Sequence, residues 1–118
     1  MDSTKDITHS KHQYDISDAL KKVDPDWEDE RYCGGFTRID IVNKRLGVAV
    51  EYFGDYWHCN PEIYDDDFFN KSLKCTAVEK QECDRIRLNK ILVRSKHVSL
   101  IIVVWEKRFN EIKDCDII

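Results

Sequence analysis

Two carboxylates and a histidine lie close together in the stretch RIDIVNKRLGVAVEYFGDYWH, which runs from Arg38 to His58. Ten residues separate Asp40 from Glu51, and His58 follows Glu51 by seven positions. Mg²⁺ prefers oxygen ligands and usually takes one or two protein carboxylates together with water and substrate phosphate. A neutral imidazole can take a proton from an attacking water. These residue types indicate metal-assisted hydrolysis, with Mg²⁺ as the expected ion and Mn²⁺ able to substitute.

The segment that carries the two acids is predicted to be a β-hairpin. Residues 36–42 alternate and are rich in β-formers, residues 43–47 contain turn-forming types, and residues 48–53 form a second extended run. Side chains alternate between the faces of a strand. If the turn pairs the strands so that the faces of Asp40 and Glu51 coincide, the two carboxylates meet, which is unfavourable unless a cation lies between them.

A simpler interpretation is that both acids are solvated on an edge hairpin. For a hairpin considered alone, that is the more common situation. The histidine just beyond the second strand, His58, favours a reactive site instead.

The ordered motifs resemble the PD-(D/E)xK nuclease core. Its spacing is matched by Asp40, Glu51 and Phe53, with ten residues between the first two and one residue between the last two. The run EYFGDYWH followed by CNPEIY looks like the very short patch repair (Vsr) endonucleases and the related EDxHD homing endonucleases. The likeness extends to QECDR at 81–85 and VVWE at 103–106, and so covers residues 36–106. It implies a restriction-endonuclease-like fold and hydrolysis of phosphodiester bonds in double-stranded DNA.

The same resemblance implies roles for individual residues. Asp40 would be the central metal ligand, and Glu51 or the backbone carbonyl of Tyr52 would be a second. His58 would be the general base, and Asp84 matches an acid on the helix of the family.

Two aromatic residues, Tyr56 and Trp57, match side chains that wedge into the base stack in Vsr-like enzymes and bend the duplex. Burial of Trp57 in the core is an equally good interpretation of the sequence.

The chain also departs from the family. Ile39 stands where a proline is usual, and Phe53 replaces the lysine two residues after the second acid, so only a histidine-dependent variant of the nuclease fits. The family also places a glutamate on an upstream helix. Asp15 and Asp18 are the nearest candidates for that acid.

Structural zinc is not expected. The positions that match the Cys/His zinc ligands of Vsr enzymes are Asp55, Asn60 and Glu62. The five cysteines form no CxxC pair and are odd in number, which favours reduced thiols.

Length and composition indicate one ordinary globular domain over residues 1–118, with a flexible arm at 1–13. Hydrophobic residues make up 42% and charged residues 36% of the 118. The longest apolar run, Leu100 to Trp105, is too short to span a bilayer, and no signal-peptide pattern opens the chain. We therefore expect no membrane partner and an intracellular location, either cytoplasm-like or in a host cell if a phage or virus encodes the protein.

The net charge of −4 is divided unevenly. Residues 1–70 hold 8 Lys and Arg against 16 Asp and Glu, whereas residues 71–118 hold 11 against 7. DNA phosphates are therefore expected at the basic second half, with salt-dependent affinity. A solvated helix face is the alternative. The basic residues there include Lys71, Lys74, Lys80, Arg85, Arg87, Lys90, Arg94 and Lys96, of which Lys80, Arg85 and Arg87 are the expected DNA contacts.

The remaining pattern predicts an α/β fold: a small mixed sheet with a central hairpin flanked by helices. The expected elements are a helix at 14–23 with Ile16, Leu20 and Val23 at helical spacing, an acidic connection at 27–30, a turn at 33–35, a loop at 59–74, a helix at 76–95, a strand at 98–105 covered on both faces, and a short helix or tail at 107–118.

The long helix is predicted to bury Val78, Cys83, Ile86 and Ile91 and to expose Lys80, Arg87, Lys90 and Arg94. Asp84 lies beside the apolar stripe. It either pairs with Lys80 or Arg87 at helical spacing or points at the metal site.

The predicted function is a Mg²⁺-dependent DNA endonuclease. One alternative is a structure-specific nuclease such as a junction resolvase. Another is a catalytically inactive DNA-binding module, because Phe53 replaces the lysine. The sequence shows no separate DNA-reading part, so target choice would come from a homodimer, a partner or a region outside this chain.

Overall fold

The computed structural model describes residues 11–33 and 37–114. The predicted arm at 1–13 therefore lies mostly outside the described residues, as does the turn at 33–35. Residues 11–13 belong to the first described helix. The elements in chain order are α2 (Lys11–Val23), β1 (Trp27–Cys33), β2 (Thr37–Asn43), β3 (Val48–Phe53), β4 (Phe69–Asn70), β5 (Cys75–Thr76), α3 (Ala77–Arg94), β6 (Leu100–Trp105) and α4 (Glu106–Asp114).

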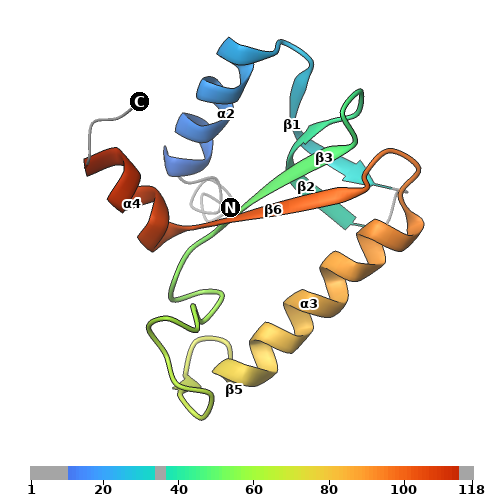
Figure 1. The fold of residues 1–118 in the computed structure, drawn as a ribbon. Coiled ribbons are helices and arrows are strands. Elements are labelled where there is room, and N and C mark those ends of the chain that lie inside the picture. Colours follow the sequence, from blue (N-terminus) through green and yellow to red (C-terminus); the bar gives the residue numbers. More distant parts are fainter. Residues whose placement is uncertain (1–10, 34–36, 115–118) are drawn as a thin grey trace, which may run out of the picture.

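The main sheet has four strands in the order β1-β2-β3-β6. β1 and β3 pair antiparallel with β2, and β6 pairs parallel with β3. Parallel neighbours need a crossover connection, and α3 provides it between β3 and β6. Figure 1 shows α2 and α3 on opposite sides of the sheet. The predicted α/β fold, with a hairpin at the centre of a small mixed sheet, is confirmed.

Two apolar clusters pack against the two faces of the sheet. Because neighbouring residues of a strand point to opposite faces, the hairpin contributes to both clusters. Val42 and Ala49 pack with Ile91 of α3, whereas Ile41 and Val50 pack with the α2 side. That second cluster also contains Trp27, Ile16 and Leu20.

The turn between β2 and β3 sets the pairing of the hairpin. Asn43 accepts the Leu46 N–H through its side chain at 3.0 Å, and its carbonyl accepts the Gly47 N–H at 2.9 Å. Gly47 has φ +74°, a left-handed conformation that suits glycine. A Cβ at this position would lie 3.0 Å from Ser99 Oγ. This turn places Ile41 opposite Val50.

The acidic segment at 27–30 is part of a strand, so the prediction of a connection was wrong. β1 pairs with β2 along its length, and Trp27 is 8% exposed. Asp29 of this strand is not left unpaired, because it accepts hydrogen bonds from Ser17 and from Lys21, the latter at 2.5 Å. In α2, Ile16 and Leu20 pack against the sheet, whereas Val23 is 85% exposed at the helix end.

The long helix has the predicted bounds but a different buried face. Thr76 forms a capping box with Glu79 at its start. Ile91 is buried as predicted, together with Ala77 and Asp84. The other residues predicted to be buried, Val78, Cys83 and Ile86, are exposed. The helix is rotated because charged residues on it find partners on the sheet side.

The last strand is covered less than predicted. β6 ends the strand order, and Leu100 and Ile102 are 51% and 46% exposed. It therefore is not buried on both faces. α4 directly follows β6, so the helix option of the predicted helix or tail at 107–118 is the one observed. Residues 115–118 lie outside the described part.

The segment at 59–74 is largely a loop, as predicted, and ends in the small β4–β5 ladder. The thiols of Cys59, Cys75 and Cys83 are free. Among the helices of the described residues, none combines the length and apolarity needed to traverse a bilayer.

Candidate active site

The hairpin brings the two predicted carboxylates together. Because Ile41 is opposite Val50 in an antiparallel pair, Asp40 faces Glu51 across the strands. The Asp40 N–H donates to Glu51 Oε2 at 2.8 Å, and the Tyr52 N–H donates to Asp40 Oδ2 at 2.9 Å. Both side chains lie on the face that α3 covers.

Glu51 of this acid pair is buried, and Asp40 is partly buried. Glu51 is only 3% exposed, and its Oε1 accepts a hydrogen bond from Arg87 of α3. Burial and then the charge of Glu51 raise the pKa of Asp40 to about 7, against the opposing effects of the Tyr52 N–H and Arg87. The alternative of two solvated acids is therefore wrong.

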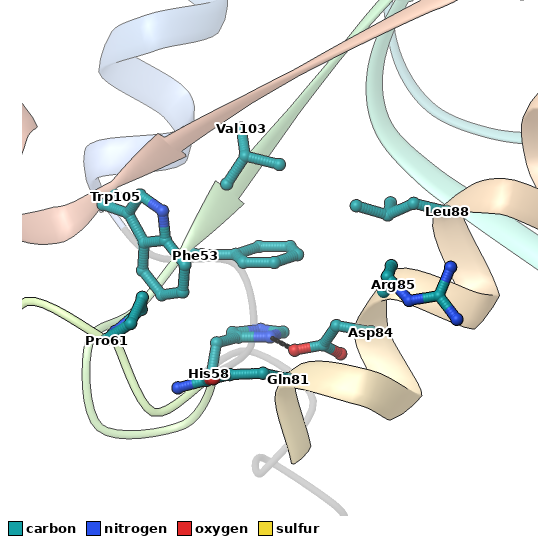
Figure 2. Close-up of a pocket in the computed structure, with 9 residues that line it drawn as sticks. All are labelled: Phe53, His58, Pro61, Gln81, Asp84, Arg85, Leu88, Val103 and Trp105. Atoms are coloured by element: carbon teal, nitrogen blue, oxygen red, sulfur yellow. Dashed lines mark hydrogen bonds and ion pairs between the residues drawn. The ribbon is translucent and has the colours of Figure 1, made fainter. Parts of the chain in front are cut away.

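A histidine and an aspartate form a second polar group under α3. His58 Nδ1 lies 2.8 Å from Asp84 Oδ2 (Figure 2), and Lys80 Nζ lies 3.1 Å from Asp84 Oδ1. Burial by itself raises the pKa of Asp84, but His58 and Lys80 outweigh it, so the net pKa is below the usual value. Asp84 is therefore ionised at neutral pH. Asp84 was expected either to pair with Lys80 or Arg87 or to point at the metal site. The structure shows the pair with Lys80 and, in addition, a contact with His58.

The imidazole of His58 is held from two directions. Its ring stacks on Phe53 with centroids 3.8 Å apart and an interplanar angle of 8°. Its Nδ1 is bonded to Asp84, so Nε2 is the nitrogen that can accept a proton when Nδ1 carries the hydrogen. Phe53, at the position where the resemblance leads one to expect a lysine, thus serves as the platform for this ring.

The loop that presents His58 is tied to both neighbouring helices. Asp55 donates its N–H to Glu106 Oε1 at 2.9 Å and accepts the Lys107 N–H at 3.3 Å, which caps the start of α4. Gln81 of α3 donates to the Cys59 carbonyl at 2.7 Å. The backbone around His58 is therefore anchored before any substrate arrives.

The positions that match zinc ligands in Vsr enzymes take part in this scaffold. Asn60 donates to Asp55 Oδ1 at 2.8 Å. Glu62 pairs with Arg108 of α4 at 3.0 Å. Hydrogen bonds and ion pairs therefore connect the segment to α4 at these places.

A cavity of about 280 Å³ opens beside His58, between the ends of β3 and β6 and the face of α3 (Figure 2). Its sheet side is apolar, and its helix side is polar apart from Leu88. Neither Asp40 nor Glu51 lines it. The residues around it are Phe53, His58, Pro61, Gln81, Asp84, Arg85, Leu88, Val103 and Trp105.

The acid pair and the His58–Asp84 pair are neighbours along the same two elements. Phe53 follows Glu51 by two residues on β3, and Arg87 follows Asp84 by one turn on α3. Over the described ranges, no three side chains of the types His, Cys, Asp and Glu gather closely enough to hold a metal ion. The structure therefore brings the predicted residues to one face, in two groups.

The acid pair suits Mg²⁺ in part. A buried carboxylate beside another carboxylate is relieved by a cation, and each oxygen has two acceptor sites, so the present hydrogen bonds leave room for a ligand bond. Asp40 and Glu51, with the carbonyl of Tyr52, would hold the ion, and water and phosphate would complete its shell. The ion pair of Glu51 with Arg87 is the feature that opposes this fit.

The aromatic pair after β3 lies at the surface. Trp57 is 55% exposed, so its assignment to the core is wrong. Tyr56 packs edge-to-face against it at 5.1 Å and bonds Ser72 at 2.8 Å through its hydroxyl. Trp57 is thus available for an external partner.

The three expected basic DNA contacts differ in their surroundings. Arg85 is exposed and pairs with Glu82 at 2.5 Å. Lys80 and Arg87 are half-buried and pair with Asp84 and Glu51, so the prediction that they lie on a wet face is wrong.

The upstream acid of the family has no counterpart at this site among the described residues. Asp15 pairs with Lys11 at 3.1 Å on α2, and Asp18 is exposed on the same helix. α2 covers the opposite face of the sheet.

Sequence reasoning missed two contacts, the pairing of Arg87 with Glu51 and the Phe53–His58 stack. The spacing of Arg87 three residues after Asp84 was the available signal, because such residues share a helix face. No sequence pattern reports the stack.

Comparison with known proteins adds no assignment: no protein-family model, no curated protein and no solved structure matches this chain. What can be said of its function therefore depends on the geometry above.

Proposed function

We propose that this protein is a metal-dependent endonuclease that hydrolyses phosphodiester bonds in duplex DNA. The observation that carries the proposal is the cross-strand pair of Asp40 and buried Glu51 on the sheet face that α3 covers, where His58 of the following loop and Asp84 of α3 also meet. Buried like charges destabilise a fold, and such groups concentrate at functional sites.

His58 supplies the general base. Ionised Asp84 accepts the Nδ1–H and stabilises the imidazolium that forms when Nε2 takes a proton from water. The stack on Phe53 restricts rotation of the ring. The water oxygen then attacks phosphorus, the bond to the leaving oxygen of the DNA backbone breaks, that oxygen takes up a proton from solvent, and His58 returns its proton to solvent.

Asp40, Glu51 and the Tyr52 carbonyl are the groups that would hold Mg²⁺, with Mn²⁺ as a substitute. When bound, the ion supplies charge neutralisation at the phosphate. The residues of this chain contribute a rigid hairpin, so the two carboxylates keep their positions through the backbone N–H groups of Asp40 and Tyr52.

DNA would approach the side of the molecule that carries Trp57. Its exposed ring can stack on a base, and Arg85 on α3 offers a cation to phosphate once it leaves Glu82. The basic residues of the second half would contact the phosphates, so binding should weaken with salt, and repulsion from the acidic first half should keep the affinity modest.

A catalytically inactive DNA-binding module is a second candidate, and one observation favours it. Arg87 already occupies Glu51, and a permanent ion pair there would keep a metal ion away. An inactive module would bind DNA without cutting it.

Nicking of supercoiled plasmid DNA in Mg²⁺ tests the proposal. Wild type, Asp40→Asn and His58→Ala are compared with His97→Ala, which removes an exposed histidine at the opposite end of the sheet. We expect nicking by wild type and His97→Ala, and a loss of at least about 100-fold in the other two.

Equal nicking by all four proteins would refute the roles proposed here and point to a contaminating nuclease. DNA binding with no nicking by wild type would support the inactive module. The inactive module would be accepted only if wild type also bound DNA without nicking it in Mn²⁺.

A further inference from the structure

Arg87 belongs neither to the hairpin nor to the His58–Asp84 pair, and the proposed function gives it no role. It extends from α3 to the sheet, where its guanidinium pairs with Glu51 Oε1. Its Nη1 also lies 3.5 Å from the carbonyl oxygen of Arg38. A helix side chain therefore reaches the centre of the acid pair.

Glu51 depends on this contact. Its side chain is 4% exposed, so little water solvates its charge. Its other oxygen is held by the Asp40 N–H. A buried carboxylate without a cationic partner is strongly unfavourable, and the neighbouring carboxylate of Asp40 adds repulsion. In the absence of a metal ion, Arg87 offsets this charge.

The two partners are unequally buried. The side chain of Arg87 is 33% exposed against 4% for Glu51. Because the Arg87 side chain is long and partly exposed, its guanidinium can turn towards water. Glu51 lies on a central strand and cannot follow. The pair can therefore open on the arginine side alone.

We propose that Arg87 is an internal counter-ion that competes with the divalent metal ion for Glu51 and is displaced when the ion binds. This inference rests on the proposed function, because it assumes that Glu51 is a metal ligand. Arg87 acts here as a positioning residue: its contact holds the Glu51 side chain in place until the ion arrives. The chain thereby supplies from α3 the cationic side chain that Phe53 does not supply from β3.

Binding of Mn²⁺ to the intact chain at pH 8, measured by electron paramagnetic resonance without DNA, tests the proposal. Arg87→Met removes the competing charge and keeps much of the apolar stem. We expect Mn²⁺ to bind this variant about tenfold more tightly than wild type, as removal of one adjacent charge from a carboxylate implies. Arg87→Lys should stay within about threefold of wild type, because it retains the charge.

Two controls separate competition from a general effect of charge or fold. Arg108→Met removes an exposed arginine that pairs with Glu62 and Glu111 on α4, and it should leave Mn²⁺ affinity unchanged. In a Glu51→Gln background, Arg87→Met should no longer tighten binding, because the ligand in dispute is neutral.

Equal or weaker Mn²⁺ binding by folded Arg87→Met would overturn the inference while leaving the metal site intact. If neither protein binds Mn²⁺, the proposed function fails instead. If Arg87→Met is unfolded in EDTA, Mn²⁺ must restore its folding, since an ion that binds only the folded state stabilises it. A variant that stays unfolded in saturating Mn²⁺ would also contradict the proposal.

Discussion

Replacement of Asp40 by asparagine should make the metal-free protein more stable at alkaline pH. Asparagine has nearly the same shape, and its side-chain oxygen can still accept the Tyr52 N–H that now bonds Asp40. What disappears is the negative charge beside Glu51. The variant therefore isolates the cost of ionising Asp40 in the folded state.

The magnitude follows from the pKa of Asp40, which is about 7 in the folded chain against a reference of 3.8. Between these values the unfolded chain has lost the proton and the folded chain has kept it. Stability therefore falls as pH rises through this window and is lower by a constant amount above it. About three pKa units at 1.36 kcal/mol each give about 4 kcal/mol. Sharing of the charge with Glu51 and Arg87 brings the expected gain of Asp40→Asn at pH 8 to about 2–4 kcal/mol.

Urea unfolding followed by tryptophan fluorescence in EDTA measures this difference at pH 4, 6 and 8. The variant and wild type should have similar free energies of unfolding at pH 4, and the variant should be the more stable at pH 8. Other titrating groups are common to both proteins and cancel in the comparison. Mg²⁺ should stabilise wild type at pH 8 and have a smaller effect on Asp40→Asn.

Asp84→Asn is the matched control, because its change has the opposite sign. The net pKa of Asp84 is lowered, so its carboxylate stabilises the fold above the unfolded value, and that stability is lost as pH falls. Asp84→Asn should therefore destabilise at pH 8. If Asp40→Asn gave no gain at pH 8 relative to pH 4, the buried, cation-requiring acid pair would not exist as described.

Three further results are expected. Asp84→Asn should lower the nicking rate by about 10- to 100-fold, since outer residues that orient a histidine have effects of that size; an unchanged rate would contradict the role of Asp84. Trp57→Ala should weaken DNA binding by about 1–3 kcal/mol but change the free energy of unfolding by less than about 0.5 kcal/mol, because the ring is 55% exposed; binding by fluorescence anisotropy and urea unfolding measure the two. Mn²⁺ affinity, measured by calorimetry, should rise between pH 6 and pH 8, because protons compete with the ion for Asp40; a flat profile would exclude Asp40 as a ligand.

Local patterns predicted the hairpin and the long helix well. Alternation and turn residues placed the strands within one residue of β2 and β3, and the helix at 76–95 begins with the Thr76 cap that the structure shows. β1 was not predicted because three acids in its first four residues hide its alternation. The prediction of the buried face of α3 was wrong because it oriented the helix by its apolar residues. The rotation of the helix is instead decided by Asp84 and Arg87 through their partners.

The sequence by itself determined the hairpin and the strand face on which each of Asp40 and Glu51 lies, because the two-residue repeat of a strand is a local property. Whether the two faces coincide depended on the register of the turn, which the structure supplied. The partners of the site were decided only by the tertiary structure. Glu51 meets Arg87, and His58 meets Asp84, because α3 packs across the sheet at one rotation. That rotation depends on contacts between residues far apart in the chain, which periodicity does not record.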